Sequence, residues 1–224
     1  DTPALWIDLD AFESNALKML TLCKGQKVRW RPHVKASKSP DLAHRLIAIG
    51  AQGITCAKVA EAEAMAAGGI DDILVANEII GAAKITRLAE VAKQARVGVA
   101  CDNIENISQI SSIASKSNVT IDILVDINVG ANRCGVSPEE ASVLAHHVDE
   151  SPGLTFRGLM GYEGHVMGMQ PEDKEAASAA AAEILAQAKA LVEASGLQVE
   201  ILSGGGSGNY WHAASLGSIN ELQA

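Results

Sequence analysis

A lysine, Lys35, lies between a short apolar stretch and a Ser-Pro helix start, in the segment RWRPHVKASKSP of residues 29–40. The segment predicts that this side chain follows the end of a strand, where loops converge. Burial there, and the neighbouring cations Arg31, His33 and Lys38, would favour the uncharged amine. Because an uncharged amine attacks aldehydes, the segment indicates a lysine that forms a Schiff base. A solvated surface lysine is the alternative.

A glycine-rich segment, SGGGSGNY at residues 203–210, suggests a second kind of chemistry. Glycines leave the backbone free to direct several N–H groups to one point, and Ser207 adds a hydroxyl donor, so the segment can cradle an anion. A helix that starts after it would add the positive end of its dipole. An ordinary turn between a strand and a helix is the alternative.

The lysine and the glycine-rich segment together predict two attachment points for one small molecule. Pyridoxal 5'-phosphate carries an aldehyde and a phosphate on one ring, and proteins hold it through both. Lys35 would hold the aldehyde, and residues 205–208 would hold the phosphate.

The rest of the sequence supplies the elements that position these groups. Short runs rich in β-branched residues alternate with helical stretches, the pattern of repeated βα units around a parallel sheet. We predict helices at residues 39–50, 59–67 and 175–195 and from Ser137-Pro138 onward, and a short strand at 5–9 followed by a helix from about residue 11. The predicted strands of the sheet are residues 28–33, 53–57, 73–76, 97–101, 121–128, 158–163, 200–203 and 218–222.

This succession predicts an α/β fold of one domain, a (β/α)8 TIM-type barrel over residues 1–224. An open doubly wound sheet is the alternative, but the first βα turn, HVKASKSP, has no glycine fingerprint for a dinucleotide. In such barrels the chemistry lies at the C-terminal ends of the strands. The strand ends carry His33, Lys35, Thr55, Lys58, Asn77, Glu78, Cys101, Asp102, Asn128, Asn132, Arg133, Cys134, Tyr162, His165 and residues 203–210.

Composition excludes several classes of protein. A formal net charge of −9 and a pI near 5.1 provide no broad cationic surface, so we expect no nucleic-acid partner. The apolar runs are shorter than the roughly 18 residues of a membrane span, so we expect no membrane partner. The 4 cysteines are scattered, which is not the pattern of a metal knuckle or a disulfide framework. We expect a soluble, cytoplasmic protein.

Four segments resemble a known family: RPHVKASKS around Lys35, DINVGANRCGV around Arg133, GLMGYEGH around Tyr162, and LSGGGSGNY with the final NELQA. They are similar to the D-threonine aldolase and 3-hydroxy-D-aspartate aldolase branch of the alanine-racemase-like, fold-type III pyridoxal-phosphate enzymes. The similarity runs in order from TPALWIDLDAFESN to the last residue. It implies an alanine racemase N-terminal-domain-like barrel, followed by a C-terminal β-domain that would begin after Ala224 and is absent from this chain.

The resemblance also implies roles for individual residues. Lys35 would be the Schiff-base lysine, and Arg133 would be the partner of the pyridine nitrogen. Tyr162 would lie by the cofactor phosphate, and the phosphate cup would consist of Gly205, Gly206, Ser207 and Gly208. A guanidinium has donors only and stays charged, so it would keep the ring nitrogen unprotonated and weaken the ring as an electron sink. An arginine merely paired with Asp126 or Asp102 is the alternative.

The family resemblance further implies a divalent metal, Mn²⁺ or Mg²⁺, that polarises the substrate hydroxyl. Its ligands would lie beyond Ala224, so no residue of this chain is assigned to it. His165 is the nearest candidate for the catalytic base, although it sits earlier in its loop than the family's histidine, where this chain has Gly168 or Met169. His33 would orient the site.

The favoured function is therefore that of a lyase, which cleaves a D-3-hydroxy amino acid such as D-threonine to glycine and an aldehyde, and which pairs as a homodimer. Dehydration of D-serine or 3-hydroxyaspartate is one alternative. A pyridoxal-phosphate carrier without turnover is another.

Overall fold

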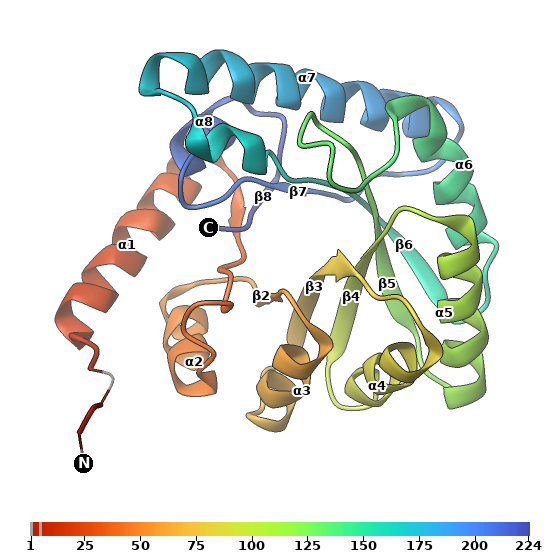
Figure 1. The fold of residues 1–224 in the computed structure, drawn as a ribbon, viewed down its shortest axis with the longest axis horizontal. Helices are drawn as coiled ribbons and strands as arrows, with labels where there is room; N and C mark the ends of the chain where they lie inside the picture. Colours follow the sequence, from red (N-terminus) through yellow and green to blue (C-terminus); the bar gives the residue numbers. More distant parts are fainter. Residues whose placement is uncertain (1, 5) are drawn as a thin grey trace.

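The fold was obtained as a computed structural model that describes residues 2–4 and 6–224. In these residues, eight parallel strands form a single curved sheet (Figure 1). The strands are β1 (Arg29–Trp30), β2 (Ile54–Cys56), β3 (Asp72–Glu78), β4 (Arg96–Cys101), β5 (Ile121–Asp126), β6 (Leu154–Gly161), β7 (Ile201–Gly204) and β8 (Glu221–Leu222).

Helices lie along the outside of this sheet, and the longest of them, α7, crosses the top of Figure 1. Among the described residues, no helix has both the length and the apolar character that crossing a lipid bilayer requires. The helices are α1 (Leu9–Gln26), α2 (Pro40–Ile49), α3 (Val59–Ala67), α4 (Ala82–Ala92), α5 (Ile104–Ser117), α6 (Pro138–Asp149), α7 (Pro171–Ala194) and α8 (Tyr210–Ser215), with a 3₁₀ turn, η1 (Gly164–Gly168).

The strand order is β1-β8-β7-β6-β5-β4-β3-β2, so consecutive strands from β2 to β8 are neighbours and β8 also pairs with β1. The two ends of this order meet through a parallel bridge between His33 and Thr55, just beyond β1. The Val34 N–H donates to the carbonyl oxygen of Thr55 over 2.9 Å. The predicted barrel is confirmed, and the bridge that joins its ends lies two residues before Lys35.

Local sequence signals explain where the helices begin. The side chain of Ser39 accepts a hydrogen bond from the Leu42 N–H, and Pro40 occupies the first helical position of α2. Ser137 and Glu140 form a reciprocal capping box at the start of α6. Both helix starts agree with the predictions.

Several predicted bounds need correction. Strands β1 and β8 are shorter than predicted, at Arg29–Trp30 and Glu221–Leu222 instead of residues 28–33 and 218–222. Residues 6–8 form no strand and Leu9 begins α1, with Asp8 as the N-cap; Leu5 lies outside the described residues. Strand β6 begins at Leu154 instead of residue 158. The prediction left out the part of the strand that contains the polar residues Thr155 and Arg157. Helix α7 begins at Pro171, four positions earlier than residue 175.

A thin apolar layer fills the barrel interior. It consists of Leu74, Ala100, Leu124, Met160 and Ile201, one residue from each of β3 to β7. A much larger apolar core lies between the sheet and the surrounding helices. The interior layer separates the two ends of the barrel, which have different chemistry.

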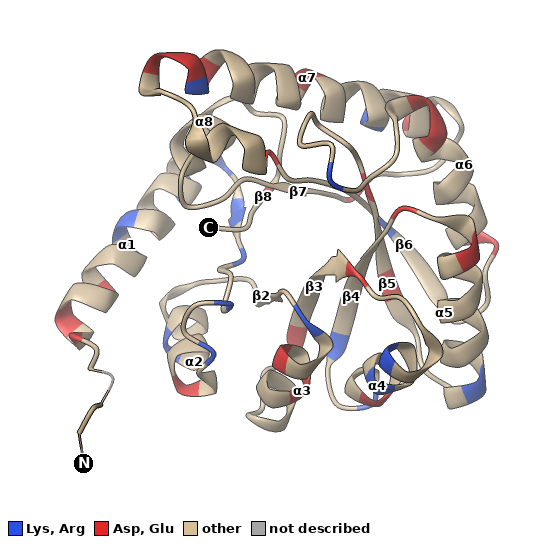
Figure 2. Cartoon of the chain, in the orientation of Figure 1, with Lys and Arg blue, Asp and Glu red and all other residues tan. Residues whose placement is uncertain are grey.

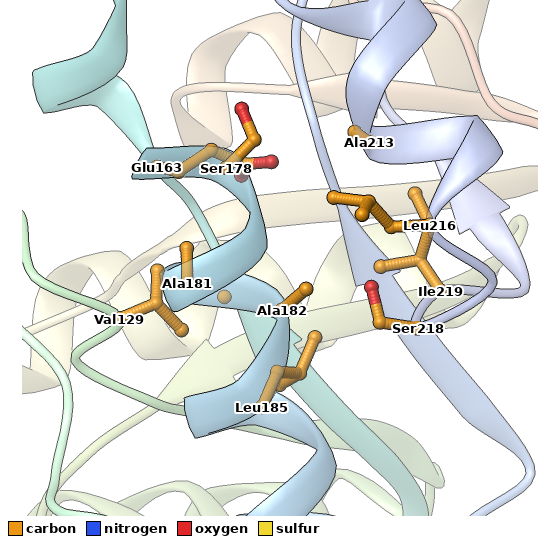
Figure 3. A pocket seen from close by; sticks show the side chains of 11 residues that line it. Val129, Glu163, Ser178, Ala181, Ala182, Leu185, Ala213, Leu216, Ser218 and Ile219 are labelled. Carbon is orange, nitrogen blue, oxygen red and sulfur yellow. The ribbon is translucent and has the colours of Figure 1, made fainter. Parts of the chain in front are cut away.

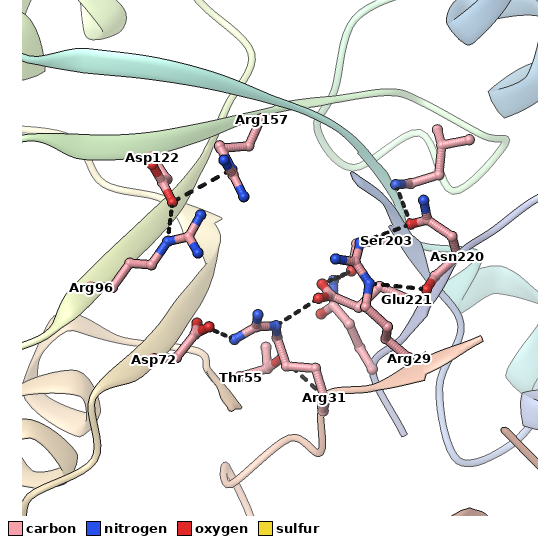
Figure 4. A network of polar contacts seen from close by, with 12 residues as sticks. Arg29, Arg31, Thr55, Asp72, Arg96, Asp122, Arg157, Ser203, Asn220 and Glu221 are labelled. Carbon is pink, nitrogen blue, oxygen red and sulfur yellow. Dashed lines mark hydrogen bonds and ion pairs between the residues drawn. The ribbon is translucent and has the colours of Figure 1, made fainter. Parts of the chain in front are cut away.

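The end formed by the N-terminal ends of the strands holds a network of charged side chains (Figure 4). Arg31 is 6% exposed and pairs with Asp72 over 2.6 Å and with Glu221 over 2.9 Å. Arg96 pairs with Asp122 over 2.7 Å. Figure 2 shows the resulting alternation of acidic and basic residues at the starts of β3 to β6. The opposite charges are paired here, around a cavity of about 140 Å³.

Candidate active site

The opposite end of the barrel, at the C-terminal ends of the strands, contains a cavity of about 690 Å³. This volume is within the range of small-molecule sites. Met160 forms part of its lining and belongs to the apolar layer below. The cavity is lined by every residue that the sequence assigned to the cofactor: Lys35, Arg133, Tyr162, Gly205, Gly206, Ser207 and Gly208.

Lys35 reaches the cavity from the turn that follows β1. Its Nζ lies 6.0 Å from the centre of the Tyr162 ring. The side chain is exposed, however, so the expected desolvation of the amine by burial is wrong for this structure. The position of Lys35 at the cavity agrees with the prediction, whereas its expected dry environment does not.

Two of the cations expected to act on Lys35 are also neutralised. Arg31 lies in the ion-pair network at the other end of the barrel. Lys38 pairs with the buried carboxylate of Glu61, which also accepts a hydrogen bond from the Ala57 N–H over 2.8 Å. Arg31 was expected near Lys35 because residues an even number of positions apart lie on the same face of a strand. That rule holds only within a strand, and β1 ends at Trp30.

His33 lies at the cavity as a neutral imidazole. Burial, and next the positive charge of Lys35, lower the pKa of His33 to about 4. Its Nδ1 accepts a hydrogen bond from the Lys35 backbone N–H over 3.3 Å, which leaves the ring proton on Nε2. His33 can therefore orient the Lys35 turn and donate one hydrogen bond, as expected of a residue that orients the site.

Tyr162, which follows β6, lies near both cationic side chains of the site, Lys35 and Arg133. The guanidinium carbon of Arg133 lies 5.5 Å from the centre of its ring, within the range of a cation–π contact. In the described part of the chain, Arg133 has no ion pair with Asp126 or Asp102. Asp102 instead accepts a hydrogen bond from the Gly135 N–H over 3.0 Å. Among the described residues, no ion pair therefore holds the guanidinium, and Arg133 lines the cavity.

Two carboxylates and a thiol, those of Glu78, Asp126 and Cys134, form a cluster beside Arg133. Each offers one atom that could bind a metal, and these atoms all lie within 4.8 Å of one another. Burial, and then the charge of Glu78, raise the pKa of Asp126 to about 8. The Cys134 thiol donates to the Asp126 carboxylate over 3.3 Å, and burial raises the pKa of this thiol to about 12. Sequence analysis placed Glu78 and Cys134 at strand ends but missed the cluster, because its members come from different strands.

The glycine-rich loop forms the wall opposite Lys35, and the positions of its glycines leave no room for side chains. A Cβ atom on Gly206 would lie 3.3 Å from Cε2 of Tyr162, and one on Gly208 would overlap Sδ of Met167. The backbone therefore approaches both side chains as closely as it can. This cradle fits a compact anionic group such as a phosphate.

His165 is not placed with the other predicted residues. It lies in η1, outside the lining of the cavity, and a Cβ atom on Gly130 would approach its ring to 3.2 Å. Its Nδ1 is buried and has no hydrogen-bond partner among the described residues. The structure therefore gives no support to His165 as the catalytic base. Met167, two residues later, lines the cavity instead and was not predicted.

A second, very small cavity lies behind the glycine-rich loop, between α7 and α8 (Figure 3). Its volume is about 10 Å³, which is at the lower limit for one water molecule. Glu163 and the buried, unpartnered Oγ of Ser178 line it. Because it holds no more than a water, this cavity is not a ligand site.

Comparison with known proteins identifies relatives over nearly the whole chain. Residues 7–222 match the family described as alanine racemase, N-terminal domain. The chain is 39% identical over 226 residues to a D-threonine aldolase from Arthrobacter sp, covering 100% of this chain and 60% of that protein. It is 42% identical over 226 residues to a 3-hydroxy-D-aspartate aldolase from Paracoccus denitrificans (strain Pd 1222), covering 99% of this chain and 58% of that protein.

A solved structure has the same fold. The D-threonine aldolase from Filomicrobium marinum superposes with a TM-score of 0.96 at 42% identity, covering 100% of this chain and 61% of that chain. The chain thus spans about 60% of the length of the relatives that it matches.

Proposed function

The chain belongs to the family of the alanine racemase N-terminal domain, and from this we propose that it holds pyridoxal 5'-phosphate in the cavity of the barrel and acts in the cleavage of D-3-hydroxy amino acids to glycine and an aldehyde. One observation carries the proposal. Lys35, Arg133 and the glycine-rich loop come from distant parts of the sequence and line one cavity. The similarity to proteins named as D-threonine and 3-hydroxy-D-aspartate aldolases supports the choice of reaction.

The residues present fit this cofactor. Lys35 would hold its aldehyde, and Ser207 with the glycine-rich loop would hold its phosphate in the cradle described above. Arg133 would donate to the ring nitrogen and, because a guanidinium cannot accept a proton, would keep that nitrogen unprotonated. When bound, the cofactor supplies a ring that withdraws electrons from the substrate. Tyr162 would bind beside the phosphate and restrain the side chains of Lys35 and Arg133 through its ring.

A divalent metal is not assigned to this chain. The cluster of Glu78, Asp126 and Cys134 fits a proton better than a dication, since the thiol donates to Asp126 and the guanidinium of Arg133 adds a positive charge beside it. The prediction that Mn²⁺ or Mg²⁺ is held by residues beyond Ala224 stays a prediction. So do the homodimer, which rests on the resemblance, and the cytoplasmic location, which rests on the composition.

The proposal is tested by incubating the complete protein with pyridoxal 5'-phosphate, Mn²⁺ and D-threonine or D-phenylserine, and by measuring the aldehyde. We expect glycine and aldehyde in equal amounts. Formation of a keto acid and ammonia would identify a dehydratase instead. If the protein binds the cofactor but forms neither aldehyde nor keto acid, the result would favour a pyridoxal-phosphate carrier without turnover.

A further inference from the structure

Two buried polar side chains, Glu163 and Asn209, lie directly behind the glycine-rich loop. Glu163 is 6% exposed and Asn209 is 2% exposed. They come from the end of β6 and from the N-cap position of α8, and 46 residues separate them in sequence. Neither faces the cavity, and neither was singled out by sequence motifs as a part of the site.

The two side chains bind the loop through a closed set of hydrogen bonds. One carboxylate oxygen of Glu163 accepts from the Gly205 N–H over 3.1 Å, and the other accepts from Nδ2 of Asn209 over 2.8 Å. Oδ1 of Asn209 accepts from the Gly206 N–H over 3.1 Å. Each of these two N–H groups and the Asn209 amide N–H₂ thus donates to its own acceptor oxygen.

This arrangement divides the donors of the loop into two sets. The N–H groups of Gly205 and Gly206 point to Glu163 and Asn209, and so are not available to a ligand. In the described part of the chain, the N–H groups of Ser207 and Gly208 and the Ser207 hydroxyl have no such partner. Among residues 205–208, these last three donors are the ones left for an anion.

We propose that Glu163 and Asn209 are positioning residues that hold the glycine-rich loop in the conformation that binds the cofactor phosphate. The inference rests on the proposed function and extends it to residues that do not touch the cofactor. The inference also divides the roles in the predicted phosphate cup. Gly205 and Gly206 have no side chains that could obstruct the phosphate, whereas Ser207 and Gly208 supply the hydrogen-bond donors.

The polarity of the pair makes a specific test available. In Glu163→Gln, one oxygen can still accept from the Gly205 N–H, but the new amide N–H₂ faces Nδ2 of Asn209, so that two donors oppose each other. Rotating the Asn209 amide would instead turn its donors toward the Gly206 N–H. Adding Asn209→Asp supplies acceptors to both the new amide at position 163 and the Gly206 N–H, which restores the whole set.

The experiment measures the dissociation constants of pyridoxal 5'-phosphate and of pyridoxal, which lacks the phosphate, for the complete protein. We expect Glu163→Gln to weaken binding of the phosphate form about tenfold or more, and that of pyridoxal less than about twofold. The double variant Glu163→Gln/Asn209→Asp should return to within about threefold of the wild-type preference. Asp122→Asn, a partly buried carboxylate at the other end of the barrel, is the control and should leave the preference unchanged.

A second readout does not require the cofactor. In the cofactor-free protein, backbone amides of residues 204–209 should exchange with deuterium faster in Glu163→Gln than in the wild type, and the double variant should restore their protection. An unchanged preference for the phosphate form in Glu163→Gln, or a double variant no better than the single one, overturns the inference. A wild-type protein with no preference for the phosphate form overturns the proposed cofactor itself, and the inference with it.

Discussion

The Nζ of Lys35 lies 6.0 Å from the centre of the Tyr162 ring, although the two residues follow different strands, β1 and β6. A small planar molecule that joins the amine to the glycine-rich loop must therefore pass along the face or the edge of this ring. The role of Lys35 and the contact between Tyr162 and the glycine-rich loop can be tested by separate substitutions.

Replacement of Lys35 by alanine should abolish the absorbance near 420 nm that a lysine-bound pyridoxal cofactor gives at about neutral pH. The matched control is Lys58→Ala, another exposed lysine that follows a strand but does not line the cavity. Spectra of both variants, recorded after addition of the cofactor and desalting, check the prediction. Retention of the band in Lys35→Ala would falsify the role of this amine.

Replacement of Gly206 by alanine should weaken binding of pyridoxal 5'-phosphate, because the new Cβ atom would lie 3.3 Å from Cε2 of Tyr162 and displace the ring. We expect an effect of roughly tenfold, equivalent to about 1.4 kcal/mol. Gly168→Ala is the control, since nothing lies within 4 Å of a Cβ atom there. Fluorescence titration with the cofactor measures both, and equal affinities would contradict the predicted contact.

Replacement of Asp126 by asparagine should change how stability depends on pH. Burial and Glu78 raise the pKa of Asp126 from 3.8 to about 8, so the folded protein retains a proton that the unfolded chain releases. The contribution of this group to stability is full below about pH 4 and is lost as the pH rises toward about 8. Asp126→Asn removes this loss, so its free energy of unfolding should fall less over that range than that of the wild type.

Urea unfolding of the complete protein at several pH values between about 5 and 8 measures this difference. Asp122→Asn serves as a control because Asp122 lies in the ion-pair network at the opposite end of the barrel. Parallel pH profiles for the wild type and Asp126→Asn would show that the proton on Asp126 is not retained.

Replacement of Glu221 by glutamine should destabilise the protein by about 3 kcal/mol, because it leaves the buried charge of Arg31 with one partner fewer. Glu221 is 1% exposed and accepts hydrogen bonds from Arg31 and Ser203. The control, Glu200→Gln, removes an exposed partner of Arg157 and should cost less than about 1 kcal/mol. Thermal unfolding of the two variants distinguishes them, and equal melting temperatures would contradict the prediction.

The sequence was a good guide to the fold wherever a local signal marks an element. Ser39-Pro40 and Ser137-Pro138 carry their helix starts in adjacent residues, and both were located correctly. The beginning of β6 was missed: Leu154, Thr155 and Phe156 pair with β5, and a register shift then separates them from the segment that was predicted. Helix α4 begins at Ala82 after Gly81, which provides no side-chain cap, and no range was predicted for it.

The candidate site was predictable as far as its parts lie at strand ends. Lys35, Arg133 and Tyr162 could be assigned to one cavity because parallel strands of a barrel end at the same rim. The environment of Lys35 could not be predicted, since the exposure of its turn and the Lys38–Glu61 pair depend on how α3 packs. Glu163 was hidden for a similar reason: its partners at Gly205 and Asn209 are more than 40 residues away.

Strand β1 pairs with β8 at Arg29 and Glu221, and the Nε1 of Trp30 donates to the carbonyl oxygen of Ala224 over 2.6 Å. During synthesis, the segment after β1 can meet β2 through the His33–Thr55 bridge, but β1 can pair with β8 only after both of these strands have left the ribosome. The cavity takes Lys35 from the turn after β1 and the glycine-rich loop from the end of β7, so it is complete only after both segments have been made. Under the proposed function, the coenzyme therefore binds late in folding and cannot guide the nascent polypeptide while β1 to β6 emerge.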